Sequence, residues 1–238
     1  MVDLIRKKIM LAGWATKDFS LEELEDYLYQ CMPNILEVSK DFVDSHISIK
    51  KTYSLIKEYK RHNPLVISYA GTTDFVNCNL FSFDEYLRYM SIQASQARFL
   101  GSAFFRAMIG GRSNTKIDVI RRLSYFEKII LPARILIEIH GGWESSIKNI
   151  QKIVNLTNYN FVIDFQNILE SDLSFQKLKN IIPKERIEYY HSRNLNLRYI
   201  EHKASITEEN YWVTKHEVDK VLWEPKLIKK QEIINIIR

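Results

Sequence analysis

The segment RILIEIHGG at residues 134–142 decides the fold. Its short apolar run predicts a buried strand, and the two glycines that follow predict the end of that strand. Residues 147–154 then show apolar positions at helical spacing and predict a helix. The pattern returns as NFVIDF at residues 160–165, followed by a second helical stretch near 175–181. Buried strands that alternate with helices are typical of a parallel sheet joined by right-handed crossovers.

The same alternation extends in both directions along the chain. Strands are predicted at residues 8–14, 34–38, 64–69, 103–109, 134–140, 160–165, 186–191 and 220–224. One helix is predicted to begin at Ser20 and a second to run through residues 53–56. Further helices are predicted at residues 82–100, 119–130, 147–154, 175–181 and 227–237. Eight strands, nearly all followed by a helix, in 238 residues predict a compact α/β protein, a single-domain (β/α)₈ TIM barrel over residues 1–238. An open doubly wound sheet is the alternative, and it is less favoured because no glycine-rich loop follows the first strand.

Composition narrows the class of protein. With 46% hydrophobic and 26% charged residues, the chain is neither disordered nor collagen-like. No stretch approaches the roughly 18 apolar residues of a membrane span, and the start does not have the pattern of a secretory signal. Cys31 and Cys78 are too few for a disulfide framework and too far apart for a CxxC motif. These observations predict a cytoplasmic protein that needs no membrane.

The charge invites a nucleic-acid interpretation. The net charge is +5 and the isoelectric point is near 9.0. The basic residues are spread along the chain, however, which favours solvated helix faces over a binding groove. We therefore expect no specific nucleic-acid partner. The sequence does not decide the oligomeric state, and a homo-oligomer is compatible with it.

Polar residues gather at the ends of the last four predicted strands. Side chains of barrel strands alternate between interior and helix layer, and active sites lie at the carboxyl ends of the strands. On this alternation Glu138, Asp164, His191 and Glu224 point inward. Three carboxylates so close would repel one another unless a cation lay between them. The four residues therefore predict one divalent metal ion, with Mn²⁺, Mg²⁺ or Co²⁺ favoured by the oxygen-rich set and Zn²⁺ as a further candidate.

Several of these segments resemble a known family. The segments are ARFLG at residues 97–101, IEIHGG at 137–142, IDFQN at 163–167, Tyr190-His191 and Trp223-Glu224-Pro225. They are similar to the strands of the xylose isomerase-like sugar isomerase and epimerase barrels, which include the ketose 3-epimerases. The resemblance covers nearly the whole chain and is most specific from residue 97 onward.

The resemblance implies a site and a reaction. One divalent ion would be bound by Glu138, Asp164, His191 and Glu224, and Glu138 and Glu224 would also transfer protons. The substrate would be a small-molecule carbohydrate: a sugar, a sugar phosphate or a related hydroxy-carbonyl compound, isomerised or epimerised through an enediolate. This chemistry is sensible because a bound ion polarises a carbonyl and the adjacent hydroxyl.

Two positions depart from the family pattern, and one fits it. Tyr69 stands at the end of the third strand, and Asn167 stands three residues after Asp164, where the family often has histidines. Both departures bear on the substrate and leave the metal ligands intact. Glu37, on the second strand, fits an acidic position of the family or serves as a structural hydrogen-bond partner.

Four residues are predicted to contact the substrate: His140, Asn167, Arg193 and Arg106. His140 shares the inward side of Glu138, with a packed core histidine as the alternative. Arg193 suits a phosphate or hydroxyl group, and Arg106 points either toward the carboxylates or away from them.

The sequence favours a metal-dependent sugar isomerase or epimerase of carbohydrate metabolism. An apurinic-site DNA-repair endonuclease shares the barrel, but its zinc cluster needs more imidazoles than the 6 histidines of this chain provide in suitable places. A ligand-binding barrel without catalysis is the third hypothesis.

Overall fold

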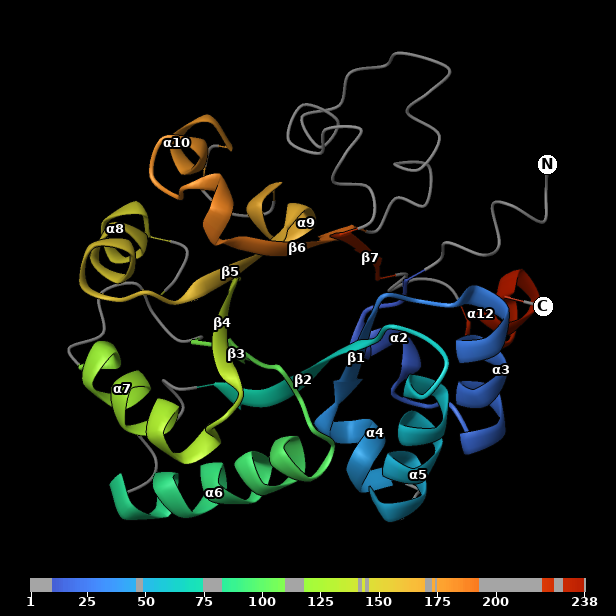
Figure 1. Cartoon of the computed structure of the whole chain (residues 1–238). Coiled ribbons are helices and arrows are strands. Elements are labelled where there is room, and N and C mark those ends of the chain that lie inside the picture. Colours follow the sequence, from blue (N-terminus) through green and yellow to red (C-terminus); the bar gives the residue numbers. More distant parts are fainter. Residues whose placement is uncertain are drawn as a thin grey trace, which may run out of the picture. The chain divides into compact units, whose positions relative to one another are not determined.

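The computed structural model describes residues 10–45, 49–74, 83–109, 118–140, 143, 146–169, 173, 175–192, 220–224 and 229–237 (Figure 1). The strands are β1 (Ile35–Ser39), β2 (Val66–Asp74), β3 (Phe104–Met108), β4 (Arg134–Ile139), β5 (Asn160–Asp164), β6 (Ile187–Ser192) and β7 (Val221–Trp223). The helices before β3 are α2 (Gly13–Thr16), α3 (Leu21–Cys31), α4 (Lys40–Ser45), α5 (Ile49–Lys60) and α6 (Phe83–Phe99). Those after it are α7 (Val119–Ile130), α8 (Ile147–Leu156), α9 (Phe165–Leu169), α10 (Phe175–Lys179), the 3₁₀ turn η3 (Lys184–Arg186) and α12 (Lys230–Ile237).

The sheet has the order that the sequence predicts. Its seven strands follow one another from β1 to β7 in chain order, and the β1–β2, β3–β4 and β4–β5 pairs are parallel. Sequential parallel strands linked by helices characterise a TIM-barrel-like α/β fold. Seven of the eight predicted strands are confirmed within one or two residues, except that β2 runs on to Asp74.

Of the first predicted strand, residues 8–14, the part that the structure describes pairs with β7 at Leu11 alone and ends earlier than predicted. From Met10 onward this segment makes one isolated parallel bridge, Leu11 to Trp223, and α2 begins at Gly13. The Ala12 N–H and the Met10 carbonyl bond to the backbone of Trp223, whereas the Gly13 N–H donates to the side chain of Glu37 at 2.8 Å and takes no part in a strand ladder. An eight-stranded barrel is therefore not established by the described residues.

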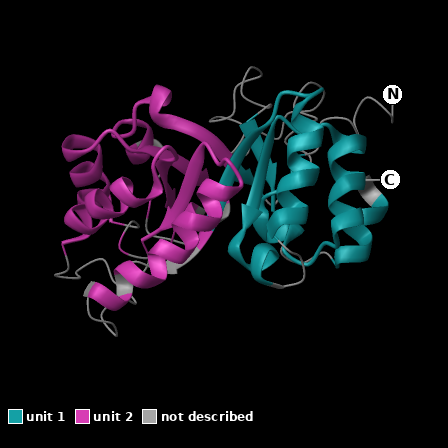
Figure 2. Cartoon of the chain, turned by 60° about the horizontal axis from the view of Figure 1, so that its bottom comes forward, with its two compact units in different colours: residues 1–70, 191–238 teal, residues 71–190 magenta. Residues whose placement is uncertain are grey.

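The chain divides into two compact units (Figure 2). Unit 1 comprises residues 1–70 and 191–238; in it α3 packs against α5 and α12, and α2 and α4 pack against β1. Unit 2 comprises residues 71–190; in it α7 packs against α6 and β4. The single domain over residues 1–238 stays a prediction.

The first long helix begins as its sequence predicts. The Ser20 hydroxyl accepts the Glu23 N–H at 3.2 Å, and the Glu23 carboxylate accepts the Ser20 N–H at 2.6 Å. This reciprocal capping box satisfies two backbone donors that the first helical turn leaves without helix partners. A serine followed three residues later by a glutamate is thus a reliable start signal in this chain.

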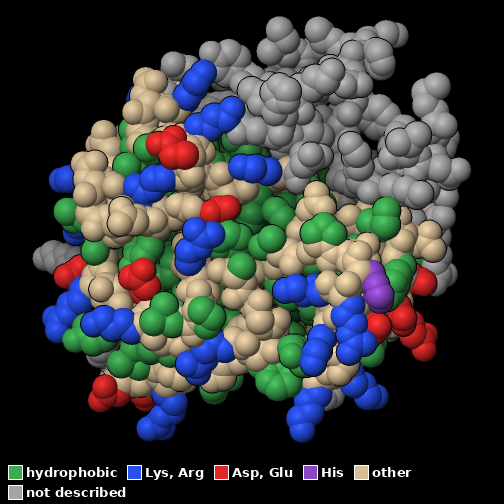
Figure 3. All heavy atoms as spheres, in the orientation of Figure 1, with side chains coloured by type: hydrophobic (Ala, Val, Ile, Leu, Met, Phe, Trp, Pro, Cys, Tyr) green, Lys and Arg blue, Asp and Glu red, His purple; other side chains and the backbone are tan. Residues whose placement is uncertain are grey.

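The outer surface carries mixed charges. On the face shown in Figure 3, Lys and Arg side chains are scattered among acidic and apolar ones. Within the described residues, no helix has both the length and the apolar character needed to cross a bilayer.

Close packing in unit 2 requires a glycine at position 71. A Cβ atom there would lie 2.5 Å from Cζ of Phe105 and 3.0 Å from Oε1 of Gln93. Phe105 is fully buried, and its ring meets that of Phe126 edge to face at 4.7 Å. The ring therefore has no room to move aside, because interiors of proteins are packed as densely as crystals.

We expect Gly71→Ala to lower the free energy of unfolding by about 1–3 kcal/mol, the usual cost of overpacking a core. The measurement is the midpoint of urea unfolding followed by circular dichroism. Ser95→Ala, on the exposed side of α6, is the control and should change stability by less than about 0.5 kcal/mol. An unchanged midpoint for Gly71→Ala would contradict the packing of Phe105 against β2.

Candidate metal centre

Strand register places Glu138 and Asp164 on the same face of the sheet. Glu138 of β4 lies beside Val162 of β5, and residues in register on parallel strands point to the same side. Asp164 comes two residues after Val162 and therefore shares that side. Arg106 of β3 lies beside Leu136, which again shares the side of Glu138. The register thus places Glu138, Asp164 and Arg106 on one face of the sheet, as the alternation along the strands predicts for Glu138 and Asp164.

Glu138 has a buried cationic partner. Its Oε2 accepts a hydrogen bond from Nη1 of Arg106, and the exposed fractions are 2% for Glu138 and 8% for Arg106. Of the two directions left open for Arg106, the one toward the carboxylates is thus the correct one. A buried carboxylate needs such a counter-charge, because loss of hydration costs it several kcal/mol.

Asp164 stands at a junction between strand and helix. It is the last residue of β5, and α9 begins at Phe165. Its Oδ1 accepts the Asn167 N–H at 3.0 Å, and its Oδ2 accepts the Asn167 side-chain amide at 2.8 Å. Two bonds from one residue fix the carboxylate, while each oxygen retains a lone pair that suits a cation. This role of Asn167 was missed from the sequence, although an Asp before a helix with a polar residue three positions later is a capping signal.

His191 is contacted by a residue of β1, which belongs to the same unit. Its Nε2 lies 3.1 Å from Oε2 of Glu37 on β1, and both residues are fully buried. The other carboxylate oxygen of Glu37 accepts the Gly13 N–H at 2.8 Å. Of the two roles considered for Glu37, the structure shows the hydrogen-bond partner.

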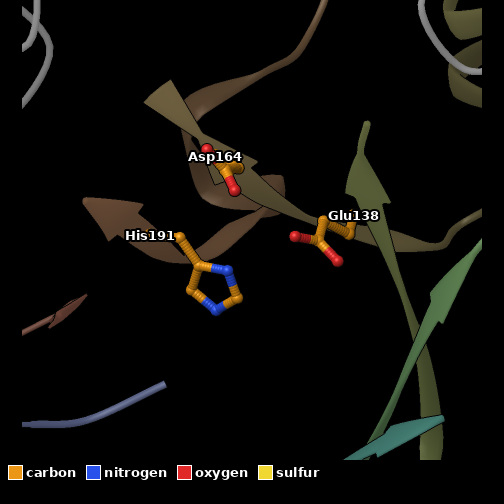
Figure 4. Close-up of side chains that lie close together, drawn as sticks. All are labelled: Glu138, Asp164 and His191. Carbon is orange, nitrogen blue, oxygen red and sulfur yellow. The ribbon is translucent and has the colours of Figure 1, made fainter. Parts of the chain in front are cut away.

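Three of the four predicted ligands form one group. Glu138, Asp164 and His191 each offer one ligand atom, and these atoms lie within 4.8 Å of one another (Figure 4). Two ligands at about 2.1 Å from an ion lie at most about 4.2 Å apart, so small side-chain adjustments would complete the contacts. Two carboxylates and an imidazole are a donor set that Mn²⁺, Co²⁺ and Zn²⁺ accept. The residues present therefore fit a divalent ion.

Glu224 lies outside this group in the part of the chain that the structure describes. It follows β7 and is buried, and its backbone N–H donates to the Ser192 carbonyl at 2.9 Å. That bond ties Glu224 to the residue after His191. Its role as a fourth ligand stays a prediction.

The remaining predicted contacts have mixed outcomes. His140 lies directly after β4 and is half-buried. Arg193 lies outside the described residues. The substrate contacts of His140, Asn167, Arg193 and Arg106 stay predictions.

Tyr69 does not lie at the end of its strand, because β2 continues to Asp74. In the β1–β2 register Tyr69 lies beside Val38, whereas Ser68 lies beside Glu37. Tyr69 therefore occupies the face opposite to Glu37, and Ser68 is the β2 neighbour of Glu37.

Comparisons with known proteins bear on the fold. Neither a scan of protein-family models nor a search of curated proteins finds a match. Solved structures do match. A xylose isomerase domain containing protein from Salmonella typhimurium LT2 has a TM-score of 0.65 at 13% identity, over 98% of this chain and 95% of its own.

Two further structures match at similar length. D-psicose 3-epimerase, solved with D-fructose, has a TM-score of 0.62 at 11% identity, over 93% of this chain and 86% of its own. The IolI protein with a bound zinc atom has a TM-score of 0.63 at 15% identity, over 97% of this chain and 95% of its own. The expected resemblance is confirmed as a structural one: this chain has the TIM-barrel-like fold of the xylose isomerase-like domain proteins and ketose 3-epimerases.

Proposed function

We propose that this chain is a metal-dependent isomerase or epimerase of a small sugar, sugar phosphate or related hydroxy-carbonyl compound. The observation that carries the proposal is the buried group of Glu138, Asp164 and His191, with ligand atoms within 4.8 Å of one another. Its support is the likeness in fold to D-psicose 3-epimerase and to the zinc-containing IolI protein.

The ligand residues would hold one divalent ion. When bound, the ion would supply Lewis-acid polarisation of a carbonyl and its neighbouring hydroxyl, which makes the proton on the adjoining carbon acidic. Asn167 keeps both oxygens of Asp164 in a fixed orientation toward the group. Arg106 stabilises the carboxylate form of Glu138, the form that binds a cation and accepts a proton.

Glu138 and Glu224 are the proposed acid–base pair. In this mechanism one carboxylate accepts the carbon-bound proton as the enediolate forms, and the other group returns a proton to the adjoining carbon or to the opposite face. Arg106 and His140 are the proposed contacts for substrate oxygens, because a guanidinium and an imidazole both donate N–H groups. Arg193 and Asn167 complete the proposed substrate set.

The endonuclease alternative is disfavoured by the ligand types. Among the described residues one histidine, His191, belongs to the ligand group, and the other members are carboxylates. A cluster of several zinc ions bound by many imidazoles does not fit that donor set. The third hypothesis, a protein that binds its ligand without catalysing a reaction, is distinguished by the second test.

The first test measures metal content. We expect the purified protein to retain close to one equivalent of Mn²⁺, Co²⁺ or Zn²⁺ after dialysis, and Asp164→Ala or His191→Ala to lower its affinity at least about 100-fold. Asp118→Ala is the matched control, since Asp118 also accepts a helix N–H, that of Arg121 at 3.1 Å, but lies outside the ligand group. Full metal retention by both site variants would refute the proposed centre.

The second test separates ligation from proton transfer. Glu138→Gln and Glu224→Gln keep an oxygen donor and nearly the same volume but remove the basic carboxylate. We expect each to slow deuterium incorporation from solvent into the substrate about 10²–10⁴-fold, the usual contribution of a general base. The measurement is proton NMR of a panel of ketoses and ketose phosphates in D₂O with the metal-loaded protein.

The matched control for this test is Glu127→Gln, which removes a carboxylate bonded to Tyr159 at 3.1 Å and should leave exchange unchanged. If both site variants exchange the substrate proton at the wild-type rate, the two-glutamate mechanism is wrong. A wild-type protein that binds metal and sugar without exchange would instead support the barrel that only binds its ligand.

A further inference from the structure

Glu37 makes two directed contacts inside unit 1. Its Oε2 lies 3.1 Å from Nε2 of His191, and its Oε1 accepts the Gly13 N–H at 2.8 Å. The three residues come from distant parts of the sequence: α2, β1 and β6. Glu37 has no exposed surface, so water does not compete for either oxygen.

The backbone at Gly13 packs closely against the carboxylate of Glu37. A Cβ atom at position 13 would lie 3.1 Å from Oε1 and 3.2 Å from Cγ of Glu37, and 3.2 Å from the Ser39 nitrogen. At those distances a side chain at position 13 would press on Glu37. The side chain of Glu37 is thus clamped between the start of α2 and the imidazole of His191.

This clamp has a consequence for the protons of the imidazole. An ionised carboxylate only accepts hydrogen bonds, so a contact with Oε2 requires hydrogen on Nε2 of His191. In the neutral ring, hydrogen on Nε2 leaves the lone pair on Nδ1. Figure 4 shows that the ring nitrogen nearer to Glu138 and Asp164 is Nδ1, the nitrogen bonded to Cγ.

We infer that Glu37 is a positioning residue that fixes His191 as its Nε2–H tautomer and presents the Nδ1 lone pair to the metal ligand group. Carboxylates that hold the distal N–H of a ligating histidine orient the ring and raise its basicity. Gly13 belongs to this arrangement because its N–H holds the second oxygen of Glu37. The inference deepens the proposed metal centre and rests on it.

The first experiment observes the tautomer without any metal. Long-range ¹H–¹⁵N correlation spectra of ¹⁵N-histidine-labelled, metal-free protein, at a pH where the ring is neutral, distinguish Nε2–H from Nδ1–H. We expect a single Nε2–H form for His191 in the wild type. In Glu37→Gln the amide can either accept from Nε2 or donate to it, so we expect a mixture or the Nδ1–H form.

The second experiment measures affinity for Zn²⁺ and Mn²⁺ by competition with a chelating dye. We expect Glu37→Gln to bind both ions about 10–100-fold more weakly, the range seen when such partners of ligating residues are removed. Gly13→Ala changes no side chain of the site but presses on Glu37, and it should weaken binding in the same direction and to a smaller extent. Glu23→Gln is the matched control: Glu23 also accepts a backbone N–H, that of Ser20, outside the site, and its loss should leave affinity unchanged.

The outcomes are separable. A wild-type His191 in the Nδ1–H form, an unchanged tautomer in Glu37→Gln, or equal metal affinity of Glu37→Gln and wild type would each overturn the inference. If Glu37→Gln does not fold, Gly13→Ala provides the same two readings. A wild type in the Nε2–H form that binds no divalent ion would overturn the proposed metal centre, while the assignment of the tautomer to Glu37 would stand.

Discussion

The burial of carboxylates inside an apolar sheet is the constraint on which the rest of the site depends. Glu37, Glu138 and Asp164 are all buried. Each ionised carboxylate loses hydration worth several kcal/mol unless hydrogen bonds or opposite charges replace it. The structure provides a different kind of partner for each: an imidazole and a backbone N–H, a guanidinium, and the two N–H donors of one asparagine. The local structure around the site is largely the set of backbone arrangements that bring these partners into place.

The charges of unit 2 explain why the arrangement suits a cation. Glu138 pairs with the guanidinium of Arg106, whereas Asp164 accepts hydrogen bonds from the neutral Asn167. Because Asn167 is neutral, it orients Asp164 without compensating its charge. A divalent ion would relieve the remaining repulsion in a way that hydrogen bonds alone do not. The partners that offset the cost of burying these carboxylates in the absence of a metal therefore also orient their oxygens for binding a metal ion.

The sequence predicts what depends on local periodicity and misses what depends on distant register. The capping box at Ser20 and the limits of α7 follow from residues within a single helix, and both are as predicted. The strand predicted at residues 8–14 ends early, at the point where a side chain of β1 binds the Gly13 N–H, a contact that no local pattern contains. The register that places Ser68 of β2 beside Glu37 of β1 is likewise set by the pairing of two strands, which no single stretch of sequence contains. The pairing of Glu37 with His191 spans 154 residues and needed the fold itself.

Similarity in fold does not identify the substrate, since the same barrel supports many reactions. At 11–15% identity the matched structures leave specificity to individual side chains of this chain. Asn167, where many epimerases have a histidine, directs its backbone N–H and its amide to Asp164. An asparagine used in this way has less donor capacity left for a substrate hydroxyl than an imidazole on its own. Under the proposed function, recognition of substrate oxygens would fall mainly to Arg106, which pairs with Glu138, and to His140 just beyond β4. If Arg106 does contact the substrate as proposed, its positive charge would favour compounds that are rich in oxygen or carry a phosphate, which is why ketose phosphates belong beside free ketoses among the compounds to be tried.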